Sequence, residues 1–199
     1  MADLLWMREN GLEARIQKLA VSGCRIMGIC GGYQMLGNRL EDPDGVEHGG
    51  QMAGLGLLPV VTRFRGSKHR TRVEGKVKKL SGVFEQMSGA GAEGYEIHMG
   101  ETTADGGCDY FADVTDCVTG QRYADGAVKN NVCGTYIHGI LDSPGLLQGL
   151  LTPLYREKGI QPGTYRDLQA YKQEQYDRLA EVIRTHLDMD AVYRIIDRA

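Results

Sequence analysis

Residues 25–37, Arg-Ile-Met-Gly-Ile-Cys-Gly-Gly-Tyr-Gln-Met-Leu-Gly, carry the pattern that decides the fold. The apolar residues before Gly28 predict a strand over 25–29, and the residues after Cys30 predict a helix over 31–38. A Gly-x-Cys-x-Gly sequence between a strand and a helix is typical of a nucleophile elbow, a sharp turn that displays one reactive side chain. Glycine permits the close backbone approach that such a turn requires.

The cysteine in this turn is a candidate nucleophile. Cys30 would lie at a helix N-terminus, where unpaired N–H groups and the helix dipole favour the thiolate and so lower the pKa of the thiol. The backbone N–H of Gly31 would point toward a developing oxyanion, and we assign Gly31 and Gly32 to the oxyanion and substrate-binding part of the site. The alternative for these residues is a phosphate-binding glycine turn that contains a buried cysteine.

A catalytic cysteine needs a base, and His138 is the best placed of the five histidines. It follows the β-rich run 132–137 and precedes Gly139. In open α/β sheets, reactive groups gather beyond the carboxyl ends of the strands, and both Cys30 and His138 occupy such positions. Their order, nucleophile first and histidine late, is that of α/β-hydrolase-type folds. The alternative is a strand-end histidine with no catalytic role.

Two further second-tier assignments come from the residues themselves. In a strand over 95–102, Glu96 and His98 share one face, where a carboxylate and an imidazole could hold an ammonium or amide group. The alternative is a solvated polar face. Gln34, in the first turns after the elbow, is a candidate for glutamine binding, and a helix-surface amide is its alternative.

Several motifs together carry a family resemblance. Residues 28–37 and 134–139, Gly-Thr-Tyr-Ile-His-Gly, resemble the glutaminase domain of class I, triad-type glutamine amidotransferases. Segments 39–45 and 94–98, with the closing run between Tyr176 and Ile196, make the chain similar to the cobyric acid synthase family of the cobalamin pathway. The resemblance covers nearly the whole chain.

The resemblance implies a fold and an activity. The fold is α/β, a three-layer class I glutamine amidotransferase-like (flavodoxin-like) sheet with helices on both faces. The implied activity is glutamine hydrolysis by a Cys30–His138 dyad, with ammonia used for ATP-dependent amidation of the b, d, e and g carboxylates of adenosylcobyrinic acid a,c-diamide. Alternatives are a glutaminase serving another acceptor (cobyrinate or hydrogenobyrinate diamide, or a cell-wall precursor), a cysteine hydrolase or peptidase, and a non-catalytic docking fragment.

Two departures from the family pattern shape these expectations. Most triad-type glutaminases carry a glutamate two residues beyond the histidine, whereas this chain has Ile140. The resemblance implies that the cobyrinate-amidating branch also lacks this acid, and Asp142 is a nearby candidate partner for the imidazole. Only a predicted helix over 3–20 precedes the elbow strand, whereas the resemblance implies earlier sheet strands and an ATP-binding domain. We therefore expect 1–199 to be an N-terminally incomplete glutaminase domain that is weakly active alone and self-associates through an open sheet edge.

The cofactors of the implied amidation reaction, ATP and Mg²⁺, are expected outside this chain. It contains no Gly-x-x-x-x-Gly-Lys-Ser/Thr motif, so ATP and Mg²⁺ are expected in the absent ATP-binding synthetase domain, with the corrinoid acceptor. The five cysteines include no Cys-x-x-Cys pair, which argues against a disulfide framework and a zinc site, and no metal is expected. This cysteine usage fits the reducing cytoplasm.

Composition bounds the remaining function classes. At 199 residues and 21.9 kDa, a single domain with a real core is the default. The formal net charge of −3 provides no basic field for nucleic acid. The basic run 63–72 is interpreted as a solvated loop or edge strand, with a phosphate- or carboxylate-facing role as the alternative. No signal peptide or membrane-spanning run is found, so a cytoplasmic location is expected.

The remaining elements follow from turn residues and periodicity. A Gly- and Pro-rich loop is expected over 42–50, a helix start at Ser143-Pro144, and a short last helix capped by Asp188 or Asp190. The other predicted strands are 57–64, 72–79, 110–114 and 126–129, the last followed by a hairpin turn at Asn130-Asn131, and the other predicted helix is 165–186.

Overall fold

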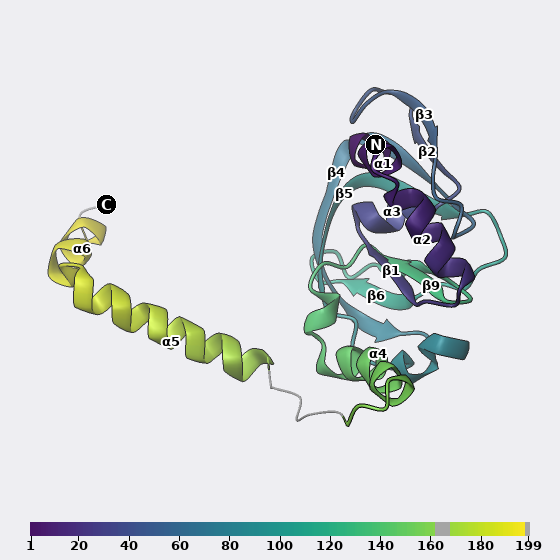
Figure 1. The fold of residues 1–199 in the computed structure, drawn as a ribbon. Coiled ribbons are helices and arrows are strands. Elements are labelled where there is room, and N and C mark those ends of the chain that lie inside the picture. The colour runs from purple at the N-terminus through teal and green to yellow at the C-terminus, as the bar shows by residue number, and fades with distance from the viewer. Residues whose placement is uncertain (162–167, 198–199) are drawn as a thin grey trace. The chain divides into compact units, whose positions relative to one another are not determined.

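The computed structural model describes residues 1–161 and 168–197. The chain divides into two compact units, Met1–Gln161 and Pro162–Ala199. The larger unit holds the predicted elbow and the strands around it (Figure 1). No helix in the described ranges combines the length and the apolarity that crossing a membrane requires.

The elbow strand belongs to a small sheet. Strand β1, Ile26–Ile29, runs parallel to β9, Val132–Thr135, and the two strands pair along their whole lengths. Strand β8, Ala127–Lys129, pairs antiparallel with the other side of β9. Asn130 takes a positive φ of 55° between β8 and β9, which confirms the hairpin turn predicted at Asn130-Asn131.

Strand β9 separates two apolar cores. Its Cys133 packs in a core with Phe84, whereas Val132 packs in a second core with Leu58. A strand buried on both faces is typical of a parallel sheet covered on both sides. Helix α3, Gly31–Leu36, follows β1 and packs against both β1 and β9. This arrangement confirms the predicted α/β class.

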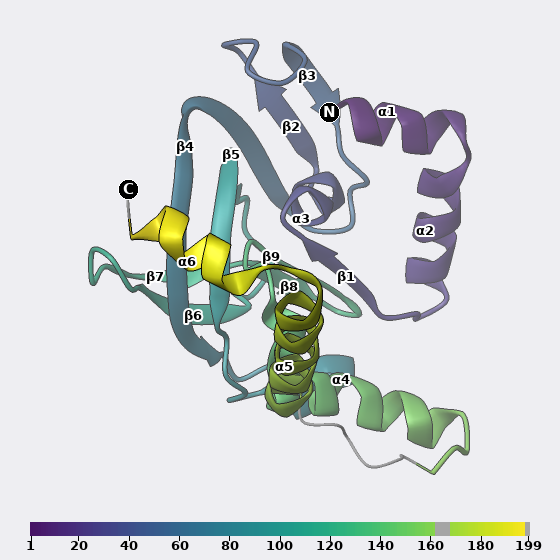
Figure 2. The same ribbon diagram turned by 90° about the vertical axis from the view of Figure 1, so that its left-hand side faces the viewer.

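The larger sheet is built around one long strand. Its order is β3-β2-β4-β6-β7, with β5 beside β4. Strand β4, Val60–Val77, is continuous and curves past β5 (Figure 2). The prediction of two separate strands, 57–64 and 72–79, is therefore wrong, because residues 65–71 belong to the same strand. The register between β4 and β5 shifts between Phe64 and His69, which accommodates the irregular stretch in a single strand. The bounds of the other strands are β2 Arg39–Asp42, β3 Gly50–Ala53, β5 Gly94–Ala104, β6 Ala112–Asp116 and β7 Arg122–Asp125.

The basic run 63–72 lies inside β4 rather than in a loop, and from Phe64 to Arg72 this strand pairs with β5 alone among the described residues, so that its other edge is open. Arg63 pairs with Glu41 of β2 on one side and with Glu101 of β5 on the other. Most of its side chains are exposed, and Arg65 forms an ion pair with Glu101 at 3.4 Å. The expected solvated edge strand is therefore confirmed for 64–72, and the two acidic neighbours of Arg63 offset its charge where the strand is paired on both sides.

The segment 42–50, predicted as a loop, joins β2 and β3 as a hairpin. The buried Asp42 carboxylate organises it by accepting hydrogen bonds from four backbone N–H groups, those of Val46, Glu47, His48 and Gly49. Burial alone would raise the pKa of Asp42, but these hydrogen bonds outweigh it and hold the pKa below its usual range.

The helix predicted over 3–20 is two helices. Helix α1 spans Ala2–Glu9 and helix α2 spans Leu12–Val21. Gly11 lies between them with φ 71°, a left-handed conformation that interrupts the helix and is most accessible to glycine. The apolar periodicity across 3–20 is shared by the two helices, so it does not reveal the break.

The remaining helices match the predicted starts. Ser143 and Pro144 open α4 and Asp188 caps α6 by accepting from the Ala191 N–H at 2.9 Å, as predicted. Residues 165–167 of the predicted helix 165–186 lie outside the described residues. The bounds are η1 Gly82–Met87, η2 Ile140–Asp142 and α4 Pro144–Glu157 in the larger unit, and α5 Leu168–His186 and α6 Met189–Ile196 in the C-terminal unit.

A buried carboxylate links the two sheets. Asp125, the last residue of β7, accepts hydrogen bonds from the Thr135 hydroxyl and from the backbone N–H of Tyr136, at the end of β9. Its side chain is buried, and this burial raises the pKa of Asp125 to about 6 although the Thr135 hydroxyl favours the charged form.

We expect Asp125→Asn to remove a pH-dependent loss of stability. Because the folded-state pKa is raised, the contribution of Asp125 is fully present below about pH 4 and is lost as the pH rises toward 6. The shift corresponds to a difference on the order of 3 kcal/mol between the two ends of this window. Urea unfolding from pH 4 to 7 should show the variant gaining stability relative to the parent as the pH rises. The exposed Asp105→Asn controls for loss of one negative charge, and parallel profiles for parent and Asp125→Asn would contradict this assignment.

Candidate functional site

The predicted elbow is present at the end of β1. Cys30 has φ 52° and ψ −113°, a conformation that is uncommon for a residue other than glycine. Its backbone N–H donates to the Thr135 carbonyl at 2.9 Å, which extends the β1–β9 pairing to the turn itself. Helix α3 starts at the next residue. Strained backbone of this kind is found at functional sites, where the surrounding structure holds it in place.

Glycine at position 28 is a packing requirement. A Cβ atom on Gly28 would lie 2.6 Å from the Leu36 Cδ1 atom and 2.7 Å from the Tyr33 nitrogen, both in α3. A Cβ on Gly31 or Gly32 would meet nothing within 4 Å. The first glycine therefore allows α3 to fold back onto β1, whereas the later two leave open space next to Cys30.

The Cys30 thiol is half-buried, and its pKa is raised, whereas the sequence predicted a lowered pKa. Burial raises the pKa of Cys30, the backbone hydrogen bond from Gly31 lowers it in part, and the Glu96 carboxylate raises it further. The six-residue helix α3 does not overcome the lost solvation of the thiolate. The Cys30 Sγ atom lies 3.7 Å from the Ile97 carbonyl oxygen of β5, within reach of a weak S–H hydrogen bond.

A cavity of about 270 Å³ adjoins the sulfur and includes Cys30, Gly31, Gln34 and His98 in its wall. The surface-amide alternative for Gln34 is wrong, because its side chain is buried and its Nε2 donates to the Tyr136 hydroxyl at 3.2 Å. The assignment of Gln34, Gly31 and Gly32 to substrate binding stays a prediction.

His138 lies beyond the end of β9 and is held by Tyr95 of β5. The two residues exchange backbone hydrogen bonds of 2.8 and 3.2 Å, and their rings stack with centroids 4.9 Å apart. The His138 Nε2 atom is buried and has no hydrogen-bond partner in the described part of the chain. Ile140 is fully buried, so the position that carries an acid in triad enzymes is part of the core.

Cys30 and His138 are both neighbours of β5, although no hydrogen bond joins them within the described residues. Cys30 contacts Ile97, and His138 contacts Tyr95, two residues earlier. Two residues of an extended strand span about 7 Å. The pairing of thiol and imidazole as a catalytic dyad stays a prediction.

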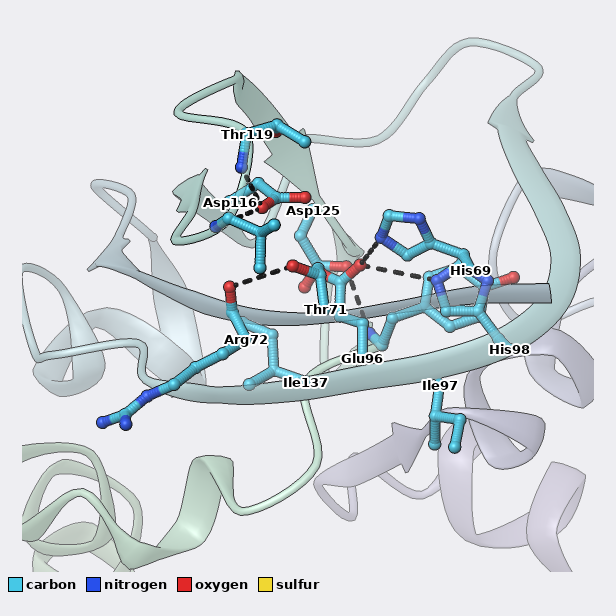
Figure 3. A network of polar contacts seen from close by, with 12 residues as sticks. His69, Thr71, Arg72, Glu96, Ile97, His98, Asp116, Thr119, Asp125 and Ile137 are labelled. Atoms are coloured by element: carbon cyan, nitrogen blue, oxygen red, sulfur yellow. Dashed lines mark hydrogen bonds and ion pairs between the residues drawn. The ribbon is translucent and has the colours of Figure 1, made fainter.

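Glu96 and His98 lie on one face of β5, as the alternation predicted, and Ile97 points to the other face (Figure 3). The alternative of a solvated polar face is wrong, because Glu96 is 2% exposed. The His98 ring stacks on Tyr136 with centroids 3.7 Å apart.

His69 is a further member of this group. His69 of β4 lies 3.2 Å from the Glu96 carboxylate and opposite His98 in the strand register. Because the predicted strands left out residues 65–71, nothing in the sequence indicated this pairing. Asp125, Tyr123 and Tyr136 line a second cavity of about 390 Å³ together with Glu96. No strand was predicted over 122–125, and the local sequence around Tyr136 does not indicate that its ring stacks on His98.

Comparisons with known proteins identify relatives of this chain. Residues 1–146 match the family model described as the CobB/CobQ-like glutamine amidotransferase domain. The chain is 45% identical over 201 residues to a cobyric acid synthase of Ruminiclostridium cellulolyticum, covering 99% of this chain and 39% of that protein. It is 41% identical over 208 residues to a cobyric acid synthase of Lachnoclostridium phytofermentans, covering 98% of this chain and 40% of that protein.

Two solved structures show weaker similarity. One, described as a glutamine amidotransferase, has 16% sequence identity and a TM-score of 0.44, covering 77% of this chain and 71% of that chain. The other, PurLQS from Thermotoga maritima, has 19% identity and a TM-score of 0.48, covering 72% of this chain and 68% of that chain. These values are too low to assign a fold by themselves.

We expect Gly28→Ala to lower the free energy of unfolding by about 1–3 kcal/mol, because its Cβ would push against α3. Gly32→Ala is the matched control, since its Cβ meets nothing within 4 Å and alanine favours the helix. Urea unfolding of the two variants and the parent measures the difference. Equal destabilisation by both substitutions would contradict the close approach of β1 and α3.

Proposed function

Because the chain belongs to the CobB/CobQ-like glutamine amidotransferase domain family, we propose that it is the glutaminase domain of a cobyric acid synthase. The relatives that carry this name match nearly all of the chain. The observation that carries the catalytic part of the proposal is the Cys30 elbow, with its positive φ and its cavity. The substrate of this domain is glutamine, and its products are glutamate and ammonia.

The proposed chemistry begins at the Cys30 sulfur. The thiolate attacks the side-chain amide carbon of glutamine and forms a tetrahedral intermediate, whose oxyanion receives a hydrogen bond from the Gly31 N–H. Collapse of the intermediate breaks the C–N bond, and His138 gives the departing nitrogen its proton. Water, deprotonated by the same imidazole, then attacks the thioester and releases glutamate and the free thiol.

The electrostatics of the site explain why a base is needed. Burial raises the pKa of Cys30, so the thiol does not ionise without help. The His138 Nε2 atom has no hydrogen-bond partner in the described residues, which supports its role as the acceptor of the thiol proton. Stacking against Tyr95 holds the imidazole plane, a task that a carboxylate performs in triad enzymes and that Ile140 cannot perform.

The wider reaction belongs to a longer protein. The chain spans about two fifths of the length of the curated relatives that it matches. We propose that ammonia passes to a synthetase domain that uses ATP and Mg²⁺ to amidate the b, d, e and g carboxylates of adenosylcobyrinic acid a,c-diamide. A related glutaminase serving another acceptor is the second candidate, and amidation assays with each acceptor distinguish the two.

Glutamine hydrolysis should depend on Cys30 and His138. We expect Cys30→Ala to abolish glutamate release and His138→Ala to lower it by about 10²–10⁴-fold, since general acid–base catalysis contributes this much. An electrophilic diazoketone analogue of glutamine should label the parent once, and should not label Cys30→Ala. Cys117→Ala, which removes an exposed thiol, is the matched control and should be labelled like the parent.

Three outcomes would contradict this assignment. Glutamate release or labelling that persists in Cys30→Ala would place the nucleophile elsewhere. Labelling by a peptide or ester electrophile, with glutamine ignored, would favour a hydrolase or peptidase. A docking fragment would release no glutamate in any state, including the complete enzyme.

We expect the chain alone to be a weak glutaminase that gains activity from the part of a full-length relative that this chain does not match. In the described residues β1 pairs only with β9, so its other edge is open to further strands or to a second chain. An oxyanion-hole donor supplied by additional strands is worth about 10²–10³ in rate. Glutamate release measured with and without the unmatched part of a full-length relative added in trans should show a gain of this size, together with loss of concentration-dependent self-association in sedimentation. Full turnover by the chain alone would contradict the expectation.

A further inference from the structure

Three potential metal ligands converge on the face of β5 opposite to Ile97 (Figure 3). They are His69 of β4 and Glu96 and His98 of β5, and their ligand atoms all lie within 4.8 Å of one another. The antiparallel register places His69 opposite His98, and strand alternation places Glu96 on the same face as His98. We propose that these three residues bind a divalent transition-metal cation, with zinc as the preferred ion.

The spacing of the ligand atoms fits one ion. The Glu96 Oε2 atom lies 3.2 Å from the His69 Nε2 atom and 3.4 Å from the His98 Nε2 atom. Zinc binds imidazole nitrogen at 2.0–2.1 Å and carboxylate oxygen at 2.0–2.2 Å in tetrahedral geometry, which sets the nitrogen and the oxygen about 3.3–3.5 Å apart. The two carboxylate–imidazole distances lie within about 0.1 Å of this range, and the two imidazole nitrogens lie within 4.8 Å of each other.

The hydrogen bonding of His98 points the same way. Its Nδ1 atom lies 2.7 Å from the Gly100 carbonyl oxygen, and a carbonyl only accepts, so Nδ1 carries the hydrogen. In the neutral ring the Nε2 lone pair then faces the Glu96 carboxylate oxygen, and two acceptors repel unless a positive centre lies near both. Metal-binding histidines usually make this outer hydrogen bond to a carbonyl or carboxylate.

The carboxylate at the centre is buried and incompletely satisfied. Glu96 is 2% exposed, and its Oε1 atom has no hydrogen-bond partner within the described residues. Burial, and then the nearness of this carboxylate, raise the pKa of the Tyr123 hydroxyl on the wall of the same cavity, but no hydrogen bond of normal geometry joins the two groups. A buried charge of this kind needs a cation or a full set of hydrogen bonds. A bound cation with a coordinated water would supply both needs.

The donor set selects the class of metal. Two imidazoles and one carboxylate suit zinc and neighbouring transition ions, whereas Mg²⁺ and Ca²⁺ prefer oxygen-only sites. Three protein ligands leave one position of a tetrahedral ion free, and the cavity of about 390 Å³ that Glu96, His69 and His98 line has room for water or a small ligand there. The site is therefore of the open kind rather than the closed structural kind.

The test is a zinc titration of the metal-stripped full chain. Binding is measured by isothermal titration calorimetry and by competition with a chromophoric chelator. We expect one zinc ion per chain, and at least about tenfold weaker binding in His69→Ala and in Glu96→Gln. His69 is the safer variant for folding, because its side chain is 43% exposed. His186→Ala removes an exposed histidine elsewhere and should bind zinc like the parent.

Free thiols also bind zinc, so Cys30→Ser is titrated in parallel and should retain the site. Cobalt substitution provides a readout independent of affinity: the parent should give the visible absorption of a four-coordinate Co²⁺ ion, and His69→Ala should lose it. Zinc binding that is unchanged in both cluster variants, or that disappears in Cys30→Ser, would overturn the proposal. Absence of stoichiometric binding in the parent would also overturn it, and would leave a proton as the positive centre between His98 and Glu96.

Discussion

The last hydrogen bond between β1 and β9 is the contact on which the site depends. Cys30 donates its N–H to Thr135, and this bond ends the parallel pairing at the residue where the chain must turn. Thr135 and the next residue, Tyr136, are in turn bound to the buried Asp125 at the end of β7. The position of the thiol is therefore set by a chain of contacts that reaches from the small sheet into the larger one.

The two faces of strand β5 contribute residues to two different cavities. Its residues Tyr95 and Ile97 meet His138 and Cys30, whereas its His98, with Glu96, faces the second cavity. The alternation of a strand permits this division, because successive side chains point to opposite sides. His98 lines both cavities, so the proposed glutaminase site and the histidine–carboxylate cluster share a residue and a strand.

Burial, rather than the helix dipole, dominates the electrostatics of this region. It raises the pKa of Cys30 and the pKa of Asp125, and in both cases the hydrogen bonds offered to the charged form compensate only in part. Asp42 shows the opposite balance, because four backbone N–H groups converge on one carboxylate. The number of donors that the fold directs at each group decides the sign, and local sequence does not specify that number.

The sequence by itself determined the elbow, because a strand, a Gly-x-Cys-x-Gly turn and a helix are local features. The need for glycine at position 28 is also local, since the backbone that a Cβ would meet belongs to Tyr33, five residues later in the chain. It also determined the shared face of Glu96 and His98, which follows from a period of two. Only the tertiary structure decided that β4 is continuous and that His69 joins the cluster, since cross-strand register depends on contacts between distant segments. The burial that raises the pKa of Cys30 was likewise decided there, because solvent is excluded by residues far along the chain.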